Sequence, residues 1–350
     1  MTKRLRGWGL LLCVILVGGS LHAQQEPQFT NYVFNALAYN PAYAGSKGYL
    51  SIVALHRTQW AGWNRDGNGG APQTQSLSAH SPLGERVALG GSLVHDRIGA
   101  TASTLANATY AYRIDFGTGE LALGLQAGLR HWGADWDQLS YKDPRALDGV
   151  FAGENPSLLQ PNFGAGLYYH SEQFYFGISI PSLLRVKLRE RGLIEDEQRY
   201  AQRYRHYYFT AGAAFPINGD RDLVFKPSFL IKSVGLFGQF SNDQTLSGNV
   251  GAPNAFDLDA ALLLQEMLWV GAAFRSAFEA FGNDPGEPGR SSHSSVDAYV
   301  NVLLGNGLRL GFAYDYALTP IQDYSAGSFE LLLGYDFSYD VKKVSSPRYF

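Results

Sequence analysis

The sequence is poor in cysteine, in charge and in long apolar segments. Its single cysteine, Cys13, lies in an apolar run near the start, so disulfide bonds do not hold the rest of the chain together. Only 17% of the residues are charged, and 28 basic against 31 acidic side chains give a formal net charge of -3. That balance provides no positive surface for a phosphate backbone, which argues against nucleic-acid binding.

The first 23 residues are typical of a secretory signal peptide. Lys3, Arg4 and Arg6 precede an apolar run from Leu10 to Val17, and small residues lead to a predicted cleavage site after Ala23. The run is shorter than the ~20 residues that a membrane-spanning helix needs. No later stretch approaches that length, so a membrane crossing by the exported chain would have to use the strands of a closed β-barrel.

Apolar and polar residues alternate along much of the chain, which is the pattern of β-strands with one apolar face. The clearest runs are residues 121–130, 308–316 and 329–337. Charged residues on their polar side would face a lumen, which tolerates them; these are Arg130, Arg309, Asp315, Glu330 and Asp336. Counting all such runs predicts fourteen strands, near residues 49–58, 73–80, 87–95, 104–115, 120–132, 162–169, 174–180, 206–215, 222–232, 256–264, 268–275, 295–304, 308–317 and 328–337.

The connections between these strands alternate between short and long. Links after even-numbered strands have at most six residues, and links after odd-numbered strands, such as 96–103 and 133–161, have at least eight. Outer-membrane barrels sort their links in this way, with short periplasmic turns at one rim and long outer loops at the other. The sequence therefore predicts an all-β fold, a transmembrane antiparallel β-barrel of about fourteen strands with both termini periplasmic.

This interpretation divides the chain into four parts. They are a signal peptide at 1–23, an N-terminal periplasmic or plug-like segment at 24–48, the outer-membrane barrel at 49–337 and a C-terminal periplasmic tail at 338–350. The N-terminal segment is rich in aromatic and amide residues, which suits packing into the lumen and equally suits direct contact with a partner. Its candidate residues are Phe29, Tyr32, Phe34, Pro41 and Tyr43.

Short motifs along the chain resemble those of a known family. The segment begins with QEPQFTNYVFN at residues 25–35, and NPAYAGS follows at 40–46. Further motifs are RTQW at 57–60, GAPQTQS at 70–76, SAHSPL at 78–83, DRIG at 96–99, YAYR at 110–113, LQPNFG at 159–164, RHYY at 205–208, FKPS at 225–228 and GFAYDY at 311–316. Together they resemble the PorP/SprF family of outer-membrane proteins from the type IX secretion and gliding-motility system of Bacteroidetes.

The resemblance implies a non-enzymatic barrel that binds the C-terminal domain of secreted cargo and helps to export it or anchor it at the cell surface. The implied partners are the type IX secretion translocon, the cargo and outer-membrane lipid, with a periplasmic partner for the tail as an open question. Residues 242–254 and 282–295 look particular to this chain, so the cargo stays unnamed. The alternative is an outer-membrane channel or transporter for small solutes.

Two further sets of residues are candidates for partner binding. Trp60 and Trp63 lie at a predicted strand end, where they would form part of the aromatic girdle at a membrane interface or contact a partner. The link 181–205 is the most charged part of the chain, and it forms either a solvated structural face or a docking surface for cargo or translocon. Its candidate residues are Arg185, Arg189, Tyr200 and Tyr204.

Catalytic and metal-binding patterns are not found in the sequence. The histidines are scattered singly, and none has the acid, base or nucleophile spacing that catalysis uses. The chain also has neither a cysteine pair nor a His-x-His motif that would hold a metal ion. We therefore expect no enzymatic activity and no cofactor.

Overall fold

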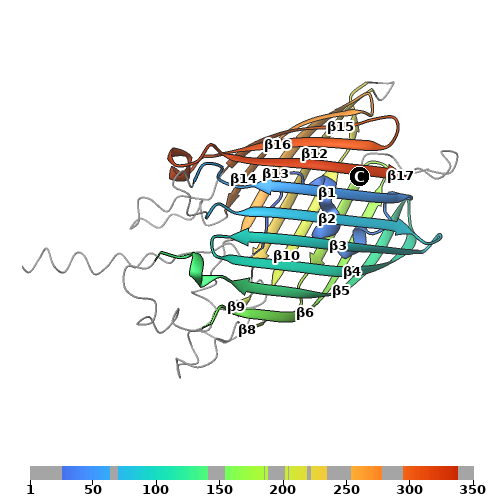
Figure 1. Cartoon of the computed structure of the whole chain (residues 1–350). Coiled ribbons are helices and arrows are strands. Elements are labelled where there is room, and N and C mark those ends of the chain that lie inside the picture. Colours follow the sequence, from blue (N-terminus) through green and yellow to red (C-terminus); the bar gives the residue numbers. More distant parts are fainter. Residues whose placement is uncertain are drawn as a thin grey trace, which may run out of the picture.

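The computed structural model describes residues 26–63, 70–140, 154–184, 186–187, 202–203, 205–218, 222–234, 254–277 and 295–337. In this part of the chain, antiparallel strands close into a barrel (Figure 1). Its wall consists of fourteen strands: β1 (Leu50–Thr58), β2 (Gln73–Pro82), β3 (Val87–Ile98), β4 (Thr101–Phe116), β5 (Gly119–Ala134), β6 (Ser157–Ser171), β7 (Phe174–Ile180), β10 (His206–Ala213), β12 (Leu223–Val234), β13 (Ala255–Leu264), β14 (Leu268–Ala277), β15 (Ser295–Leu303), β16 (Leu308–Ala317) and β17 (Ser328–Phe337).

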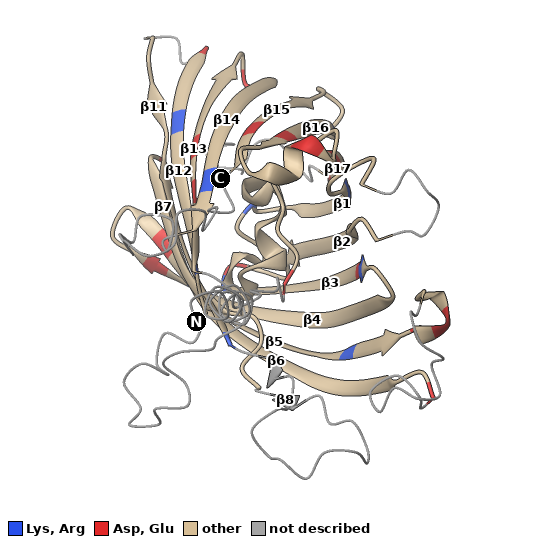
Figure 2. Cartoon of the chain, turned by 90° about the vertical axis from the view of Figure 1, so that its left-hand side faces the viewer, with Lys and Arg blue, Asp and Glu red and all other residues tan. Residues whose placement is uncertain are grey.

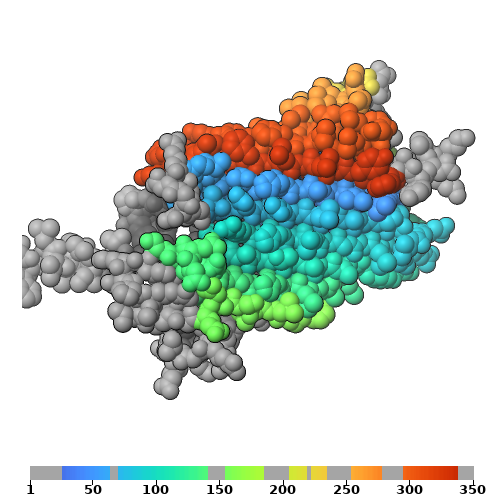
Figure 3. Space-filling view, viewed as in Figure 1, coloured from blue at the N-terminus to red at the C-terminus, as the bar shows by residue number. Residues whose placement is uncertain are grey.

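The wall closes because the first strand pairs with the last, so the surfaces of β1 and β17, blue and red in Figure 3, lie side by side. β1 and β17 are antiparallel, with Leu50 opposite Phe337 and Thr58 opposite Phe329. The other strands pair in chain order, and β10 lies between β7 and β12. β11 (Phe215–Pro216) continues β10 along β12, while β8 (Val186–Lys187) and β9 (Gln202–Arg203) form a separate two-stranded sheet. The predicted barrel of fourteen strands is confirmed, and the orientation of its rims in the membrane stays a prediction.

The two faces of the wall divide as the alternation predicts. On β5, the side chains of Leu123, Leu125 and Leu129 point outward and are 46%, 61% and 53% exposed. Gln126 and Arg130 lie on the opposite face of the same strand and are buried. The same holds for the other predicted lumen charges, and Arg309, Asp315, Glu330 and Asp336 are all buried. Burying these polar side chains requires polar partners inside the barrel. The outer face is therefore apolar and the inner face polar.

One predicted link is much shorter than expected. The sequence pattern places a link at 96–103, but β3 runs to Ile98 and β4 begins at Thr101, so only Gly99 and Ala100 lie between them. Gly99 has a φ of +57°, a left-handed conformation that suits glycine in a tight turn. β4 and β5 have 16 residues each, more than the ~10 that cross a membrane. Their polar ends can therefore be strand even though their composition resembles a loop.

The N-terminal segment lies inside the barrel (Figure 2). It forms two short 3-10 helices, η1 (Tyr32–Ala38) and η2 (Pro41–Tyr43). Asn40 starts η2, because its Oδ1 accepts a hydrogen bond from the Ala42 amide and Pro41 follows at the first helical position. The three clusters of buried apolar residues all join this segment to the inner wall, so the core of the protein is the contact between segment and barrel.

The remaining helices of the described residues are short. η3 (Trp136–Gln138) follows β5, and η7 (Pro320–Asp323) lies between β16 and β17. None of the helices within the described ranges has the length and apolar content needed to span a membrane. In Figure 1, the ends of the strands that carry the long links lie at the left together with the tight β3–β4 turn, and the other tight turns lie at the right. We call these two ends the long-link rim and the short-turn rim.

Candidate functional site

The N-terminal segment is fixed in the lumen by one carboxylate of the wall. Glu330 on β17 is fully buried, and its two oxygens accept hydrogen bonds from the backbone N–H groups of Thr30 at 2.9 Å and Asn31 at 2.8 Å. The Thr30 hydroxyl donates to Asp315 at 2.6 Å. Hydrogen bonds to an ionised group are stronger than neutral ones. Glu330 therefore satisfies two backbone N–H groups of the segment, and Asp315 holds the Thr30 side chain.

Two buried arginines neutralise the carboxylates around this anchor. Arg57 pairs with Asp315 and lies 3.3 Å from Glu330. Arg275 donates two hydrogen bonds of 2.9 Å to Asp257, and one of its nitrogens lies 3.2 Å from the carbonyl oxygen of Phe29. A buried charge is tolerated when it is paired and hydrogen-bonded. The strands β1, β13, β14, β16 and β17 thus form one polar network with residues 29–31.

A second attachment lies near the short-turn rim. The Lys47 Nζ is 3.2 Å from Asp336, which also pairs with Arg309 on β16. Burial, with the nearby Arg309 guanidinium, lowers the pKa of Lys47 to about 7, and burial raises the pKa of the Tyr43 hydroxyl to about 12. Both shifts follow from the burial of these two side chains at this end of the segment.

Backbone contacts reinforce this attachment. The Gly45 amide donates to Nδ1 of His80 at 3.1 Å, and Arg113 donates to the Gly45 carbonyl at 3.1 Å. Since Glu26 pairs with Arg130 near the long-link rim, the segment runs through the lumen from that rim to the short-turn rim, where β1 begins. For the residues that the structure describes, the N-terminal end and the wall ends at Leu50 and Phe337 therefore lie at opposite rims, which differs from the prediction that both termini lie on the periplasmic side.

Aromatic packing completes the contact between segment and wall. Phe29, Tyr32, Pro41 and Tyr43 are buried, and Phe34 is half-buried against Trp269 and Tyr299. Further polar contacts reach strands around the whole wall: Tyr32 with Ser228, Asn31 with Asn301, Asn35 with Ser76 and Ser78, Tyr39 with Ser179, and Asn40 with the carbonyl of Leu167. The structure thus places all five candidate residues of the segment in the lumen, and their contact with a partner stays a prediction.

Glycines of the wall make room for the segment at its closest approach. A Cβ atom added to Gly124 on β5 would collide with the backbone of Pro41 and Ala42, and one added to Gly166 on β6 would collide with Asn40. A larger side chain at either position would displace η2 from the wall. The wall is therefore shaped for a segment in contact with it.

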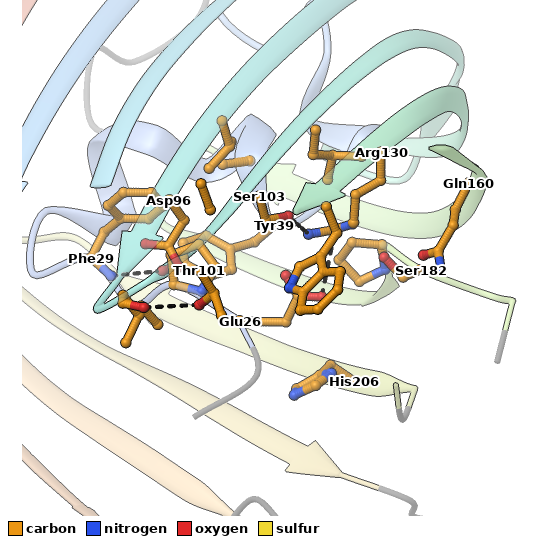
Figure 4. A pocket seen from close by; sticks show the side chains of 18 of the residues that line it. Glu26, Phe29, Tyr39, Asp96, Thr101, Ser103, Arg130, Gln160, Ser182 and His206 are labelled. Carbon is orange, nitrogen blue, oxygen red and sulfur yellow. Dashed lines mark hydrogen bonds and ion pairs between the residues drawn. The ribbon is translucent and has the colours of Figure 1, made fainter. Parts of the chain in front are cut away.

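A cavity of about 260 Å³ remains between the segment and the wall near the long-link rim. Glu26, Phe29 and Tyr39 line it from the segment, and Arg130 and Gln160 line it from β5 and β6 (Figure 4). Arg130 donates to Ser103 at 3.3 Å and lies 3.5 Å from Glu26. The cavity thus combines aromatic surface with charges of both signs.

The other predicted partner-binding residues fall in different places. Trp60 and Trp63 lie beyond the end of β1, with their ring centres 6.0 Å apart, and the Tyr324 ring lies 6.0 Å from that of Trp63. The sequence prediction missed Tyr324, because it is distant in the chain and only the pairing of β1 with β17 brings it here. Arg185, Arg189, Tyr200 and Tyr204 lie outside the described residues.

The described residues contain no group of three His, Cys, Asp or Glu side chains that could hold a metal ion. The buried carboxylates of the lumen instead bind guanidinium groups and backbone N–H groups. This arrangement fixes a polypeptide segment in place. The sequence prediction missed this role of Glu330, although a glutamate within an otherwise apolar strand signals an inward, paired position.

Comparison with solved structures finds similar chains at low sequence identity. The chain is similar to the TodX deltaS2S3 mutant monoaromatic hydrocarbon channel, at 12% identity over 87% of this chain and 94% of that chain, with a TM-score of 0.49. It is also similar to a Pseudomonas aeruginosa FadL homologue, at 13% identity over 92% of this chain and 96% of that one, with a TM-score of 0.46. No curated protein matches the sequence.

The family model described as "Type IX secretion system membrane protein PorP/SprF" matches residues 21–335 of the chain. The match includes the N-terminal segment in the lumen and nearly the whole wall, and it confirms the resemblance carried by the motifs at 25–35 and 40–46. The chain belongs to the PorP/SprF family of type IX secretion system membrane proteins.

Proposed function

We propose that this outer-membrane barrel binds the C-terminal domain of secreted cargo and helps to export it or anchor it at the cell surface, without enzymatic activity. Membership of a type IX secretion family supports the proposal. The observation that carries it is the filled lumen, in which Glu330 and the surrounding charges hold residues 29–31. A barrel whose interior is occupied by its own chain is better suited to binding at its rims than to conduction.

The long-link rim is the proposed cargo-binding end. The strand ends there are joined by long links, as expected of the outer face, and the aromatic cluster of Trp60, Trp63 and Tyr324 lies at the same rim. Tyr324 is 69% and Trp63 46% exposed, and exposed aromatic side chains are frequent anchors at protein interfaces. The charged link 181–205 stays a second proposed docking surface. In this orientation the short-turn rim faces the periplasm, where the translocon and a partner for residues 338–350 would bind.

The rival function is a channel or transporter for small solutes. It requires a continuous water path through the lumen, whereas the segment contacts strands on all sides of the wall. Conduction would require that the segment leave, and its buried ion pairs would then have to be separated. The filled lumen therefore favours the binding function.

Affinity purification from native outer membrane tests the proposal. A tagged full-length chain is extracted in mild detergent, and bound proteins are identified by mass spectrometry beside a strain that lacks the gene. We expect a secreted protein in stoichiometric amount that also disappears from the cell surface of the deletion strain. A barrel that purifies alone, and that conducts ions steadily in a planar bilayer, would contradict the proposal and favour the channel.

Deletion within the link 181–205 tests the second docking surface. The deletion should release cargo into the medium while the barrel keeps its heat-sensitive migration on electrophoresis, the usual sign of a folded barrel. Retention of cargo by a folded deletion variant would exclude that link as the docking surface.

A further inference from the structure

One strand of the wall has an unpaired edge at the long-link rim. β6 pairs with β5 from Ser157 to Ser171, but with β7 only from Ala165 to His170. β7 ends at Ile180, and the last backbone contact beyond it on this side of β6 is the Leu183 amide, which donates to the carbonyl of Phe163 at 2.7 Å. No described strand pairs with residues 157–162 on that side. This stretch, which we call the β6 edge, is about 20 Å long at the usual rise of a strand.

The direction of the backbone groups follows from two hydrogen bonds. The carbonyl of Pro156 accepts from Ala134 on β5, whereas the carbonyl of Phe163 accepts from Leu183 on the opposite side. Because backbone groups alternate along a strand, odd-numbered residues of β6 point away from β5. The N–H and C=O groups of Ser157 and Leu159, and the C=O of Pro161, therefore point out of the edge.

Pro161 occupies a position that is typical of an edge strand. Proline has no N–H group and is found in sheets only where that group would not join a ladder. Here its missing N–H is on the open side, and its carbonyl remains available as an acceptor. Leu159 beside it is 67% exposed. Exposed edges pair readily with another chain unless they are blocked, and one proline leaves most of this edge open.

The cavity of about 260 Å³ lies on the inner side of the same edge. Gln160 points inward from the edge and lines the cavity. Trp132 of β5, Ser182 after the end of β7 and His206 at the start of β10 line it as well. Its volume is slightly below the 300–1,000 Å³ that is typical of small-molecule sites, so it would hold one or two side chains. Peptides that add to a sheet edge use main-chain hydrogen bonds for affinity and pockets for alternate side chains for specificity.

We propose that the β6 edge binds an extended segment of the secreted cargo, which adds as a strand beside residues 157–162 and inserts an inward side chain into the cavity. This inference rests on the proposed cargo-binding function and specifies the form of the bound cargo. An extended polypeptide segment fits because the edge presents donors and acceptors at strand spacing, which a small solute would not satisfy. The aromatic walls and the Glu26–Arg130 pair would accept an apolar side chain with a polar end.

A pair of substitutions at one position tests the backbone contact. Leu159→Pro removes the edge N–H, and Leu159→Thr removes the same exposed side chain but keeps that N–H. Both suit an edge strand, as Pro161 two residues further on shows. The probe is the secreted protein that co-purifies with the full-length barrel and is lost from the surface of the deletion strain. We expect Leu159→Thr to retain it at the wild-type level and Leu159→Pro to lower its retention roughly tenfold.

Hydrogen exchange of the same peptide region provides a second measurement. Amides of residues 157–163 should exchange quickly in the purified cargo-free barrel and slowly in the cargo complex. Equal retention by the Pro and Thr variants would overturn the edge as the binding site while leaving the proposed function intact. Slow exchange in the cargo-free barrel would also overturn it, because the chain itself would then cover the edge. A wild-type barrel that retains no cargo would overturn both proposals.

Discussion

Replacement of Glu330 by alanine should release the N-terminal segment from the lumen. The substitution removes the acceptor of the Thr30 and Asn31 amides and leaves Arg57 with one carboxylate partner, Asp315, in place of two. A hydrogen bond to a charged acceptor contributes about 1.5–3 kcal/mol, so the loss of both amide contacts favours detachment of the segment by roughly 3–6 kcal/mol. At 1.4 kcal/mol for each factor of ten, a value near ~4 kcal/mol increases the population of detached segment roughly a thousandfold.

The extent of release can be measured by hydrogen exchange and by conductance. In Glu330→Ala, amides of residues 29–35 should exchange far faster than in the wild type, and the barrel should show ion-conducting openings in a planar bilayer. Glu330→Gln should be intermediate, since its amide oxygen can still accept one backbone N–H while its amino group faces the other. Glu172→Gln at the exposed turn between β6 and β7 is the matched control and should change neither measurement.

Slow hydrogen exchange in Glu330→Ala would contradict the role of Glu330 as the anchor of the segment. If residues 29–35 of Glu330→Ala exchange as slowly as those of the wild type, while the barrel stays folded, Glu330 is not the anchor. The aromatic contacts of Phe29, Tyr39 and Tyr208 would then be sufficient to hold the segment.

Three further predictions follow from the same contacts. Deletion of residues 26–46 should turn a silent barrel into one that conducts steadily in planar bilayers, and silence of the deletion variant would show that the lumen closes in another way. Gly124→Ala should lower stability by about 1–3 kcal/mol through overpacking against Ala42, measured as a lower unfolding temperature on heat-shift electrophoresis, whereas Gly305→Ala, which meets no atom within 4 Å, should not. An epitope tag inserted after Ala23 should be accessible to antibody on intact cells, and a tag after Phe350 should not; the reverse result would invert the orientation assigned to the rims.

The strands and their faces could be predicted because both depend on a local period of two. Each strand of the wall has lipid-exposed residues on one side and lumen residues on the other, so alternation in the sequence marks it directly. The prediction failed at 96–103, where polar residues near Asp96 and Ser103 belong to strands. Outside the apolar layer of the membrane, a residue on the outer face of a strand can be polar. The alternation of apolar and polar residues therefore no longer distinguishes a strand from a link.

The contents of the lumen could be predicted only in part. Aromatic residues at 29–43 indicated either packing or partner contact, and no local pattern distinguishes the two. The partners of Glu330 are backbone amides about 300 positions earlier in the chain, which no side-chain pattern reveals. The β6 edge was also missed, because β6 begins at Ser157 rather than near 162, and an unpaired edge becomes visible only when the neighbouring strand is known to stop short.

The filled lumen and the open edge together explain why binding at the rim is the favoured function. Transport through the interior would require the segment to leave, which separates Lys47 from Asp336 and takes the Glu330 acceptor away from the amides of residues 30 and 31, and each loss is unfavourable in a dry environment. Adding a strand to the β6 edge breaks none of these contacts and satisfies backbone groups that have no partner among the described residues. Cargo can thus bind to a barrel that stays closed, which lets the protein hold a partner at the surface without opening a hole in the membrane.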